Sequence, residues 1–417
     1  MTKSLSGAAA PVKETALSKL LPAANRKSVC LFIAVNFLWW VGLYLYVPVL
    51  PVYIQDTGAN LGMVGAVLAA YAIPQVLLRI PLGIISDKIG KRKSIVATGI
   101  ILTSIGALGL GLASDTWSLF FSRLITGTGA ATWLAFPFYF TAYYPAEGSG
   151  KAIGIINFVR SIALITATAA GGFIAEGFGI TQPFFLAAAL GIFALAGLML
   201  TGEARMQRES TVNNHGTLHI ATRPLLLVVS LMGILLHFAI FTGVFGFIPI
   251  YAAGIGASEG ELGLITMVNL GFSALGALAA IWIWQKIGYR RTIFWSALLM
   301  SISIFVIPFT DTFSALIAAQ VPNGLGNGVI MTLFMLLSIH GVPREQQATT
   351  MGVFQAVYAI GMLAGPLTSG FLSNSLSLSS VFYLASALVL LIALLAFLPV
   401  FPGHIKNRNA ASRANRS

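Results

Sequence analysis

The chain has 417 residues, of which 57% are hydrophobic and only 9% are charged. A soluble domain usually carries about 25% charged residues, so the composition excludes an ordinary water-facing surface and indicates a protein embedded in a lipid bilayer. The net charge of +12 lies in short clusters between apolar runs, which argues against a nucleic-acid-binding face. The single cysteine, Cys30, excludes an intramolecular disulfide and a cysteine-cluster metal site.

Twelve apolar stretches are long enough to cross a membrane, which takes about 20 helical residues. In chain order, spans 1 to 12 are 29–53, 61–85, 94–113, 117–142, 152–174, 181–201, 224–251, 262–284, 292–310, 313–339, 348–372 and 378–401. We therefore expect an all-α membrane protein with twelve transmembrane helices in two pseudo-symmetric six-helix bundles around a central cavity. The expected bundles are 29–201 and 224–403, joined by a cytoplasmic linker at 202–223 and flanked by cytoplasmic tails at 1–28 and 404–417.

The distribution of charge sets the expected orientation. All but three of the 24 basic residues fall in the tails or in the even-numbered links, whereas the odd-numbered links carry only acids. Because basic loops stay on the cytoplasmic side, both termini are predicted to be cytoplasmic, in the inner membrane. The three exceptions, Arg79, Arg123 and Arg160, lie within spans.

An internal repeat relates the two halves. The segment 87–93 matches 285–291, the pair Pro51 and Tyr53 matches Pro249 and Tyr251, and Gly172 matches Gly370, all at an offset of 198 residues. Around Leu61 and Leu262 we expect an offset of 201, with small compensating insertions. Repeated halves are common in transporters, so the repeat favours two equivalent bundles that enclose a site.

The link after span 2 carries Gly83, Asp87, Lys88, Gly90, Lys91, Arg92 and Lys93 in the pattern Gly-x-x-x-Asp-Lys-x-Gly-Lys-Arg-Lys. This resembles the signature loop between helices 2 and 3 of the major facilitator superfamily. The resemblance covers the whole chain and implies a transporter whose spans 1, 4, 7 and 10 line the cavity. It also implies that Asp87 locks the outward-facing state; the alternative is that the basic residues only set topology.

Two further motifs resemble that family. Arg123, Gly127 and Gly129 resemble its helix-4 pattern, which implies proton coupling or structural hydrogen bonding for Arg123. The second half has Gln320 at the corresponding position. Gly365 and Pro366 in span 11 resemble a helix-5 motif of drug/proton antiporters, although span 5 itself has Ala167 and Thr168 there.

Charged residues inside spans are usually functional. Arg79, Arg123 and Arg160 have no carboxylate in the deep part of any span, so they predict a positive cavity that suits an anionic group on the cargo. Their alternative role is hydrogen bonding to backbone carbonyls or loop acids. For ion coupling, the candidates are His237, which lies mid-span and titrates near neutral pH, and Asp56, which could instead be a solvated loop acid.

Polar and aromatic residues in the spans complete the candidate cargo site. Asn36, Trp40 and Tyr44 share one helical face of span 1. The other candidates are Asn157, Asn269, Asn323, Gln355 and Tyr358. Interhelical hydrogen bonding for the amides and lipid-interface packing for the aromatic residues are the alternatives.

We therefore expect a secondary transporter, not an enzyme, that moves a small amphipathic organic solute with an anionic group by alternating access. Proton-coupled export is preferred; the alternatives are uptake of an organic anion by symport or facilitated diffusion, and a non-transporting membrane receptor or scaffold. We expect the lipid bilayer, the solute and protons as partners, a monomer, and no nucleic acid, cofactor or metal.

Overall fold

The computed structural model describes residues 26–89, 92–145, 148–202 and 223–401. The expected tails and the linker lie almost wholly outside these residues. Within the described part of the chain every regular element is helical, which confirms the all-α fold class.

The first bundle contains spans 1 to 6. Its elements are α1 (Arg26–Tyr44) and α2 (Leu50–Asp56), α3 (Leu61–Ala70) and α4 (Ala72–Ile89), α5 (Arg92–Leu112), α6 (Thr116–Ala131), η2 (Thr132–Leu134) and α7 (Ala135–Thr141), α8 (Ser149–Phe178), and α9 (Gln182–Met199). Spans 1 and 2 are each divided between two helices, and span 4 is divided among α6, η2 and α7.

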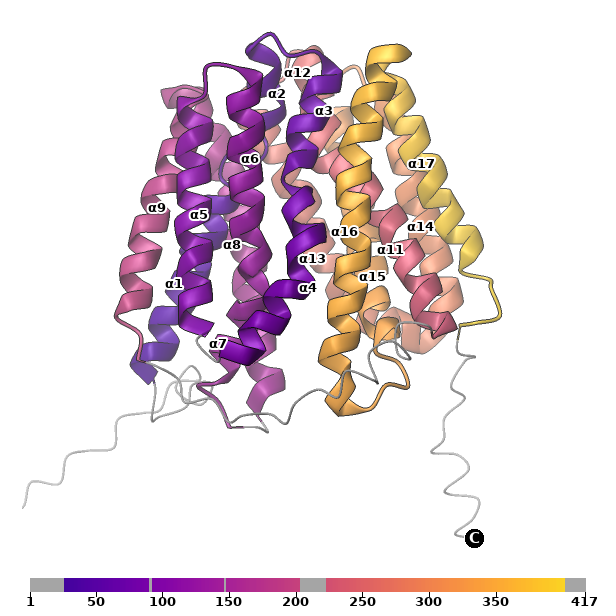
Figure 1. Cartoon of the computed structure of the whole chain (residues 1–417). Coiled ribbons are helices and arrows are strands. Elements are labelled where there is room, and N and C mark those ends of the chain that lie inside the picture. Colours follow the sequence, from indigo (N-terminus) through magenta and orange to yellow (C-terminus); the bar gives the residue numbers. More distant parts are fainter. Residues whose placement is uncertain (1–25, 90–91, 146–147, 203–222, 402–417) are drawn as a thin grey trace, which may run out of the picture.

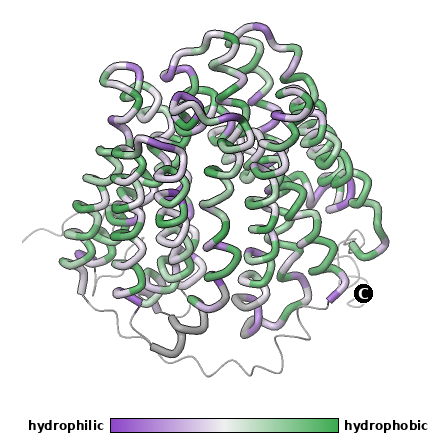
Figure 2. The backbone as a smooth tube through the Cα atoms, turned by 45° about the horizontal axis from the view of Figure 1, so that its top comes forward, coloured by the Kyte–Doolittle hydropathy of each residue, from purple (hydrophilic) through white to green (hydrophobic). Residues whose placement is uncertain are grey.

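The second bundle contains spans 7 to 12. Its elements are α11 (Pro224–Thr242), the π-helical η4 (Gly243–Phe247) and α12 (Ile248–Gly254), α13 (Glu259–Ile287), α14 (Tyr289–Val306) and η5 (Ile307–Phe309), α15 (Phe313–Ser338), α16 (Arg344–Ser375), and α17 (Leu378–Leu395). Figure 1 shows the two sets of helices side by side, with hydrophobic residues covering most of the helical walls in Figure 2.

Eleven described helices are long and apolar enough to cross a membrane. Span 4 is the remaining one, because the 3₁₀ turn η2 divides it and leaves α6 with 16 residues. Pro137 explains the interruption: it has no N–H to donate to the carbonyl of Trp133, four residues earlier. The described residues of span 4 remain helical through η2 and α7, so the expected twelve spans are all present as helical segments.

The bundles touch at one end through two pairs of crossing helices, α3 with α16 and α8 with α13. At the first crossing a β-carbon on Gly65 would lie 2.2 Å from the carbonyl oxygen of Pro366 and 2.9 Å from Cα of Gly370. At the second, a β-carbon on Gly172 would lie 2.5 Å from the Glu259 carbonyl oxygen and 2.8 Å from Cα of Gly263. Only glycine allows backbones to approach this closely.

These two crossings are copies of one contact. Gly65 and Gly263 are 198 residues apart, as are Gly172 and Gly370. The helix starts agree, because Asn60 caps α3 and Ser258 caps α13, again 198 residues apart. The offset of 201 expected around Leu61 is therefore wrong, since the first turn of α13 begins three residues earlier than the apolar run that suggested it.

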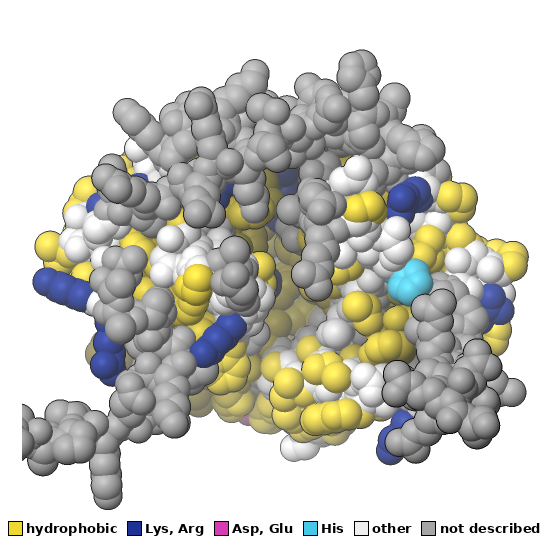
Figure 3. Space-filling model, turned by 90° about the horizontal axis from the view of Figure 1, so that it is seen from below, with side chains coloured by type: hydrophobic (Ala, Val, Ile, Leu, Met, Phe, Trp, Pro, Cys, Tyr) yellow, Lys and Arg dark blue, Asp and Glu magenta, His cyan; other side chains and the backbone are white. Residues whose placement is uncertain are grey.

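The opposite end is open. Figure 3 views this end and shows a hollow with hydrophobic walls between the two bundles, with basic side chains around it. Two basic residues bond to the last described residues of other helical segments: Lys93 Nζ donates to the Thr201 carbonyl at 2.7 Å, and Arg290 Nη2 donates to the Phe401 carbonyl at 3.1 Å. The structure is thus closed at the glycine crossings and open at the basic end.

Candidate functional site

Arg79 joins the two bundles near the middle of the fold. It is only 9% exposed, and its Nη1 donates to the backbone carbonyl of Gln355 in α16 at 3.0 Å. Its Nη2 donates to the side-chain oxygen of Gln75, one turn earlier in α4. The guanidinium carbon lies 5.6 Å from the ring centre of Tyr358. Arg79, Gln355 and Tyr358, predicted separately as cargo contacts, therefore lie together.

Arg160 rests on an aromatic platform. Its guanidinium carbon lies 4.7 Å from the ring centre of Trp40 and 5.8 Å from that of Trp133. Trp40 and Trp133 meet edge to face at 4.9 Å. Stacking satisfies the faces of the guanidinium but not its N–H donors, and the buried Nε has no hydrogen-bond partner. The two rings therefore position the Arg160 guanidinium while its Nε–H is left to donate to a ligand.

His237 lies in the same region as these two arginines. Its ring stacks on Tyr358 with centres 3.8 Å apart and planes 6° from parallel. Its Nδ1 lies 2.9 Å from the Gly233 carbonyl oxygen. Because a carbonyl only accepts hydrogen bonds, Nδ1 carries the hydrogen, which leaves Nε2 as the second ring nitrogen for another group. Arg79 and Arg160 both interact electrostatically with the ring.

Tyr44 completes the group from span 1. It interacts electrostatically with Arg160, Arg123 and Tyr358. Spans 1, 2, 5, 7 and 11 thus contribute Tyr44, Arg79, Arg160, His237 and Tyr358 to one region, which we call the central cluster. In the described part of the chain, no carboxylate forms a salt bridge with either arginine of the cluster.

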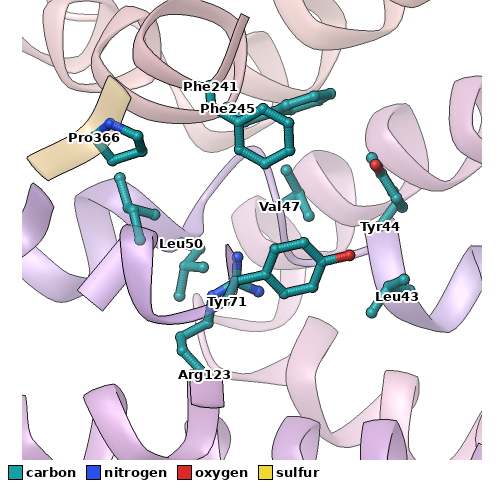
Figure 4. Close-up of a pocket in the computed structure, with 10 residues that line it drawn as sticks. Leu43, Tyr44, Val47, Leu50, Tyr71, Arg123, Phe241, Phe245 and Pro366 are labelled. Carbon is teal, nitrogen blue, oxygen red and sulfur yellow. The ribbon is translucent and has the colours of Figure 1, made fainter. Parts of the chain in front are cut away.

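Arg123 occupies a separate pocket under the closed end. The pocket is narrow and is lined by Leu43, Tyr44, Val47, Leu50, Leu68, Tyr71, Arg123, Phe241, Phe245 and Pro366. Figure 4 shows residues of both bundles around it, with Arg123 beneath the Tyr71 ring. The guanidinium carbon lies 4.5 Å from the centre of that ring, and Arg123 is 6% exposed. Gly127, one turn on, packs against the backbone of Tyr71.

Three predicted cargo contacts instead bond inside a bundle: Asn36 and Asn269 each to a neighbouring helix, and Asn323 to Gln320 of its own helix α15. Asn36 is fully buried and donates to the Ile156 carbonyl in α8 at 3.3 Å. Asn269 and Asn323 are each 1% exposed, and both donate to the side-chain oxygen of Gln320 at 3.2 Å. Asn157 is exposed and donates to the Ile153 carbonyl of its own helix. In this conformation the NH₂ groups of these amides bond to the protein itself.

The signature loop is only partly described. The backbone of α4 runs through Gly83 and Asp87, whose side chains lie outside the described ones, and Gly90 and Lys91 lie outside the described residues. Arg92 begins α5, and its guanidinium carbon lies 4.9 Å from the ring centre of Phe138. In α16, Gly365 packs against the Phe238 backbone, and Pro366 borders the Arg123 pocket.

Asp56 ends α2 at the closed side, where it is exposed. Desolvation by the neighbouring chain raises the pKa of this carboxyl, and the carboxylate of Glu259 in the other bundle raises it further. Contact between the bundles therefore brings two acids together at this end.

Sequence reasoning missed Gln75, Trp133 and Tyr71. Gln75 could have been found as the polar residue one turn before Arg79. Trp133 stands at the break in span 4, and only the turn caused by Pro137 gives it its place beneath Arg160. Tyr71 was missed because nothing in the sequence distinguishes it from other aromatic residues in the spans.

Comparison with known proteins agrees with the fold. A model of the Major Facilitator Superfamily matches residues 32–258 and 230–417. The chain therefore belongs to the major facilitator superfamily: it is a multi-pass membrane transporter and not an enzyme.

Its relatives differ in how much of the chain they match. The uncharacterized MFS-type transporter MJ1560 of Methanocaldococcus jannaschii is 22% identical over 90% of this chain and 98% of its own length. The quinolone resistance protein NorA of Staphylococcus aureus is 33% identical, but over only 38% of this chain and 40% of its own. Among solved structures, a bacterial homolog of the human lysosomal transporter Spinster has a TM-score of 0.77 at 17% identity, covering 89% of this chain and 95% of its own.

Proposed function

We propose that this transporter moves an amphipathic organic anion across the cytoplasmic membrane by alternating access, with the central cluster as the cargo site. The observation that carries the proposal is the pair Arg79 and Arg160, two deep guanidiniums with aromatic neighbours and no described carboxylate partner. An anion between them would supply the counter-charge that the protein does not. The Trp40, Trp133 and Tyr358 rings suit an apolar body on the same molecule.

The Arg123 pocket extends the proposed path. It lies under the glycine crossings, and Tyr44 interacts with both Arg123 and Arg160. When the crossings separate and the basic end closes, the same cargo would face the other side of the membrane. The open, basic end is cytoplasmic in this proposal, because basic ends of membrane proteins stay inside. The division into bundles at 29–201 and 224–403 with the linker 202–223 belongs to the same proposal.

Export is the preferred direction. The partial likeness to a quinolone resistance protein supports it, and Bacillus subtilis multidrug resistance protein 2 matches a similar share, 41% of this chain at 31% identity. His237 is the candidate proton carrier, since its Nε2 is the nitrogen left for exchange. Uptake of an organic anion is the second candidate, and the same unpaired arginines favour it.

Two measurements test the proposal. In a thermal-shift screen of the purified protein, amphipathic carboxylates and sulfonates should raise the melting temperature, and apolar cations of similar size should not. A preference for cations would refute the arginine site. In inside-out vesicles with an acidic lumen, a labelled anion identified by that screen should accumulate; gradient-dependent accumulation only in right-side-out vesicles would reverse the direction.

A further inference from the structure

Among the described residues, three buried amide oxygens on neighbouring turns of α13 and α15 have no hydrogen-bond partner. They are the side-chain oxygens of Asn269, Asn323 and Asn327, whose residues are 1%, 1% and 9% exposed. A buried acceptor without a partner costs about 1–3 kcal/mol, so three in one place point to a bound group.

The hydrogen-bond network fixes which atoms these are. Gln320 Nε2 donates to the Leu316 carbonyl at 3.4 Å, and a carbonyl cannot donate in return. Gln320 therefore turns its oxygen toward Asn269 and Asn323, and each of these must present its NH₂ group to it, at 3.2 Å in both cases. The side-chain oxygens of Asn269 and Asn323 are therefore left without a hydrogen-bond partner. Reversing any one of the three amides would place two amide oxygens, or two NH₂ groups, against each other.

A second layer follows one turn along both helices. Asn327 lies four residues after Asn323 on α15, and its Nδ2 donates to the Ser273 hydroxyl on α13 at 3.3 Å. The helices are in backbone contact here: a β-carbon on Gly324 would lie 2.2 Å from the Asn269 carbonyl oxygen, and one on Gly328 would lie 1.9 Å from that of Ser273. An organic cargo does not fit between helices packed this closely, so a ligand of these amides must be small.

The internal repeat indicates the charge of that ligand. Gly127 packs on the backbone of Tyr71 as Gly324 packs on that of Asn269, so the span 2–span 4 contact repeats as span 8–span 10. In this alignment Arg123 corresponds to Gln320, and the guanidinium of Arg123 stacks on Tyr71, the counterpart of Asn269. The first bundle thus holds a tethered cation where the second holds a shorter, neutral side chain and unpartnered oxygens.

The membrane spans of the second bundle hold no Lys or Arg that would repel a bound cation. The expected spans 7 to 12 contain no Lys, Arg, Asp or Glu. Neutral amide and hydroxyl oxygens are ligands for hard cations, and in transporters neutral carbonyls coordinate Na⁺. A divalent ion would lack the carboxylates that usually balance its charge.

We propose that Asn269, Asn323 and Asn327, together with Ser273, bind a sodium ion between α13 and α15, in the place that Arg123 fills in the first bundle. The ion provides the partner that the three oxygens lack and gives both bundles a positive charge at equivalent positions. This inference does not rest on the organic-anion proposal, because the site is complete without cargo.

The test uses purified full-length protein without cargo, with chloride salts at constant ionic strength. The melting temperature should rise saturably with NaCl, and KCl or choline chloride should not reproduce the rise. ²²Na⁺ should bind to the protein and be displaced by unlabelled Na⁺. Asn323→Ala and Asn327→Ala should each lower the apparent sodium affinity by at least tenfold. Asn36→Ala removes a buried amide from the first bundle and should leave the sodium response unchanged.

Gln320→Arg separates a sodium site from a purely structural amide cluster. A guanidinium at this position would copy the Arg123 arrangement, so this variant should fold, remain stable without Na⁺ and lose both the sodium-dependent shift and ²²Na⁺ binding. Equal melting temperatures of the unmodified protein in Na⁺, K⁺ and choline, with no ²²Na⁺ bound, would overturn the proposal and leave water as the occupant. An unchanged sodium response in Gln320→Arg would also overturn it.

Discussion

Substitutions at the glycine crossings should shift the equilibrium between the closed and open arrangements of this end most directly. A β-carbon at Gly172 would lie 2.5 Å from a carbonyl oxygen of α13, roughly 1 Å closer than ordinary contact. All three nearest atoms belong to the other bundle, so Gly172→Ala leaves its own bundle intact and opposes only the closed crossing. Overpacking of this kind costs about 1–3 kcal/mol, which corresponds to a shift of roughly 5- to 150-fold toward the open arrangement.

The shift can be read from alkylation. Val47 lines the pocket beneath the closed end, so Val47→Cys in a Cys30→Ser background is shielded from the solvent at that end until the crossings part. Gly172→Ala should raise its rate of reaction with an impermeant maleimide, added on the side of the closed end, by the factor above. Gly65→Ala, at the equivalent crossing, should have a similar effect.

The control lies on the same helix. A β-carbon at Gly177 would have nothing within 4 Å, so Gly177→Ala should leave the rate unchanged. Equal rates in the Gly172→Ala and Gly177→Ala proteins, with equal melting temperatures, would refute the reasoning that backbone contact at these glycines holds this end closed.

Three further outcomes follow. Arg79→Gln and Arg160→Gln should each weaken anion-induced thermal stabilisation by roughly 10- to 100-fold in apparent affinity, as expected for a lost charged hydrogen bond; a full response in both variants would remove them from the site. Asn36→Ala should lower the free energy of unfolding by about 0.5–1.5 kcal/mol in denaturant titrations but leave anion affinity unchanged, since it joins two helices. Because the closed end raises the pKa of Asp56, closure is favoured below that pKa and the contribution is lost as the pH on that side rises through it. Relative to an always-exposed cysteine, whose labelling also rises with pH through its thiolate, maleimide labelling of Val47→Cys should therefore speed up with pH on that side, and Asp56→Asn should remove this excess; an unaltered excess in that variant would exclude Asp56.

The sequence predicted the spans well because charge and hydropathy alone determine which segments can cross a membrane. It also singled out Arg79, Arg160, His237 and Tyr358, because polar groups in an apolar helix stand out; the structure places them in one region, and their contact with cargo stays a prediction. It did not predict which way the amides point. In a membrane helix the lipid-facing and core-facing residues are equally apolar, so periodicity does not distinguish a cavity face from a helix–helix contact.

Asn36 illustrates this limit. It shares a helical face with Trp40 and Tyr44 at the spacing expected for a cavity lining, yet its amide donates to α8 of the same bundle. Trp133 illustrates the converse, since its place beneath Arg160 depends on a turn that a proline four residues later imposes.

The central claim is that the two bundles rock about a cationic site, and it is tested most directly by two distances in one experiment. Spin labels at Gly154 and Gly352 report the open end, and labels at Gln55 and Gly254 report the closed end; the three glycines have open space for a side chain, and Gln55 is exposed. On addition of a stabilising organic anion, a population should appear in which the first distance shortens and the second lengthens, and Arg160→Gln should suppress it. Distances that stay fixed at both ends, or that change together in the same direction, would contradict the account.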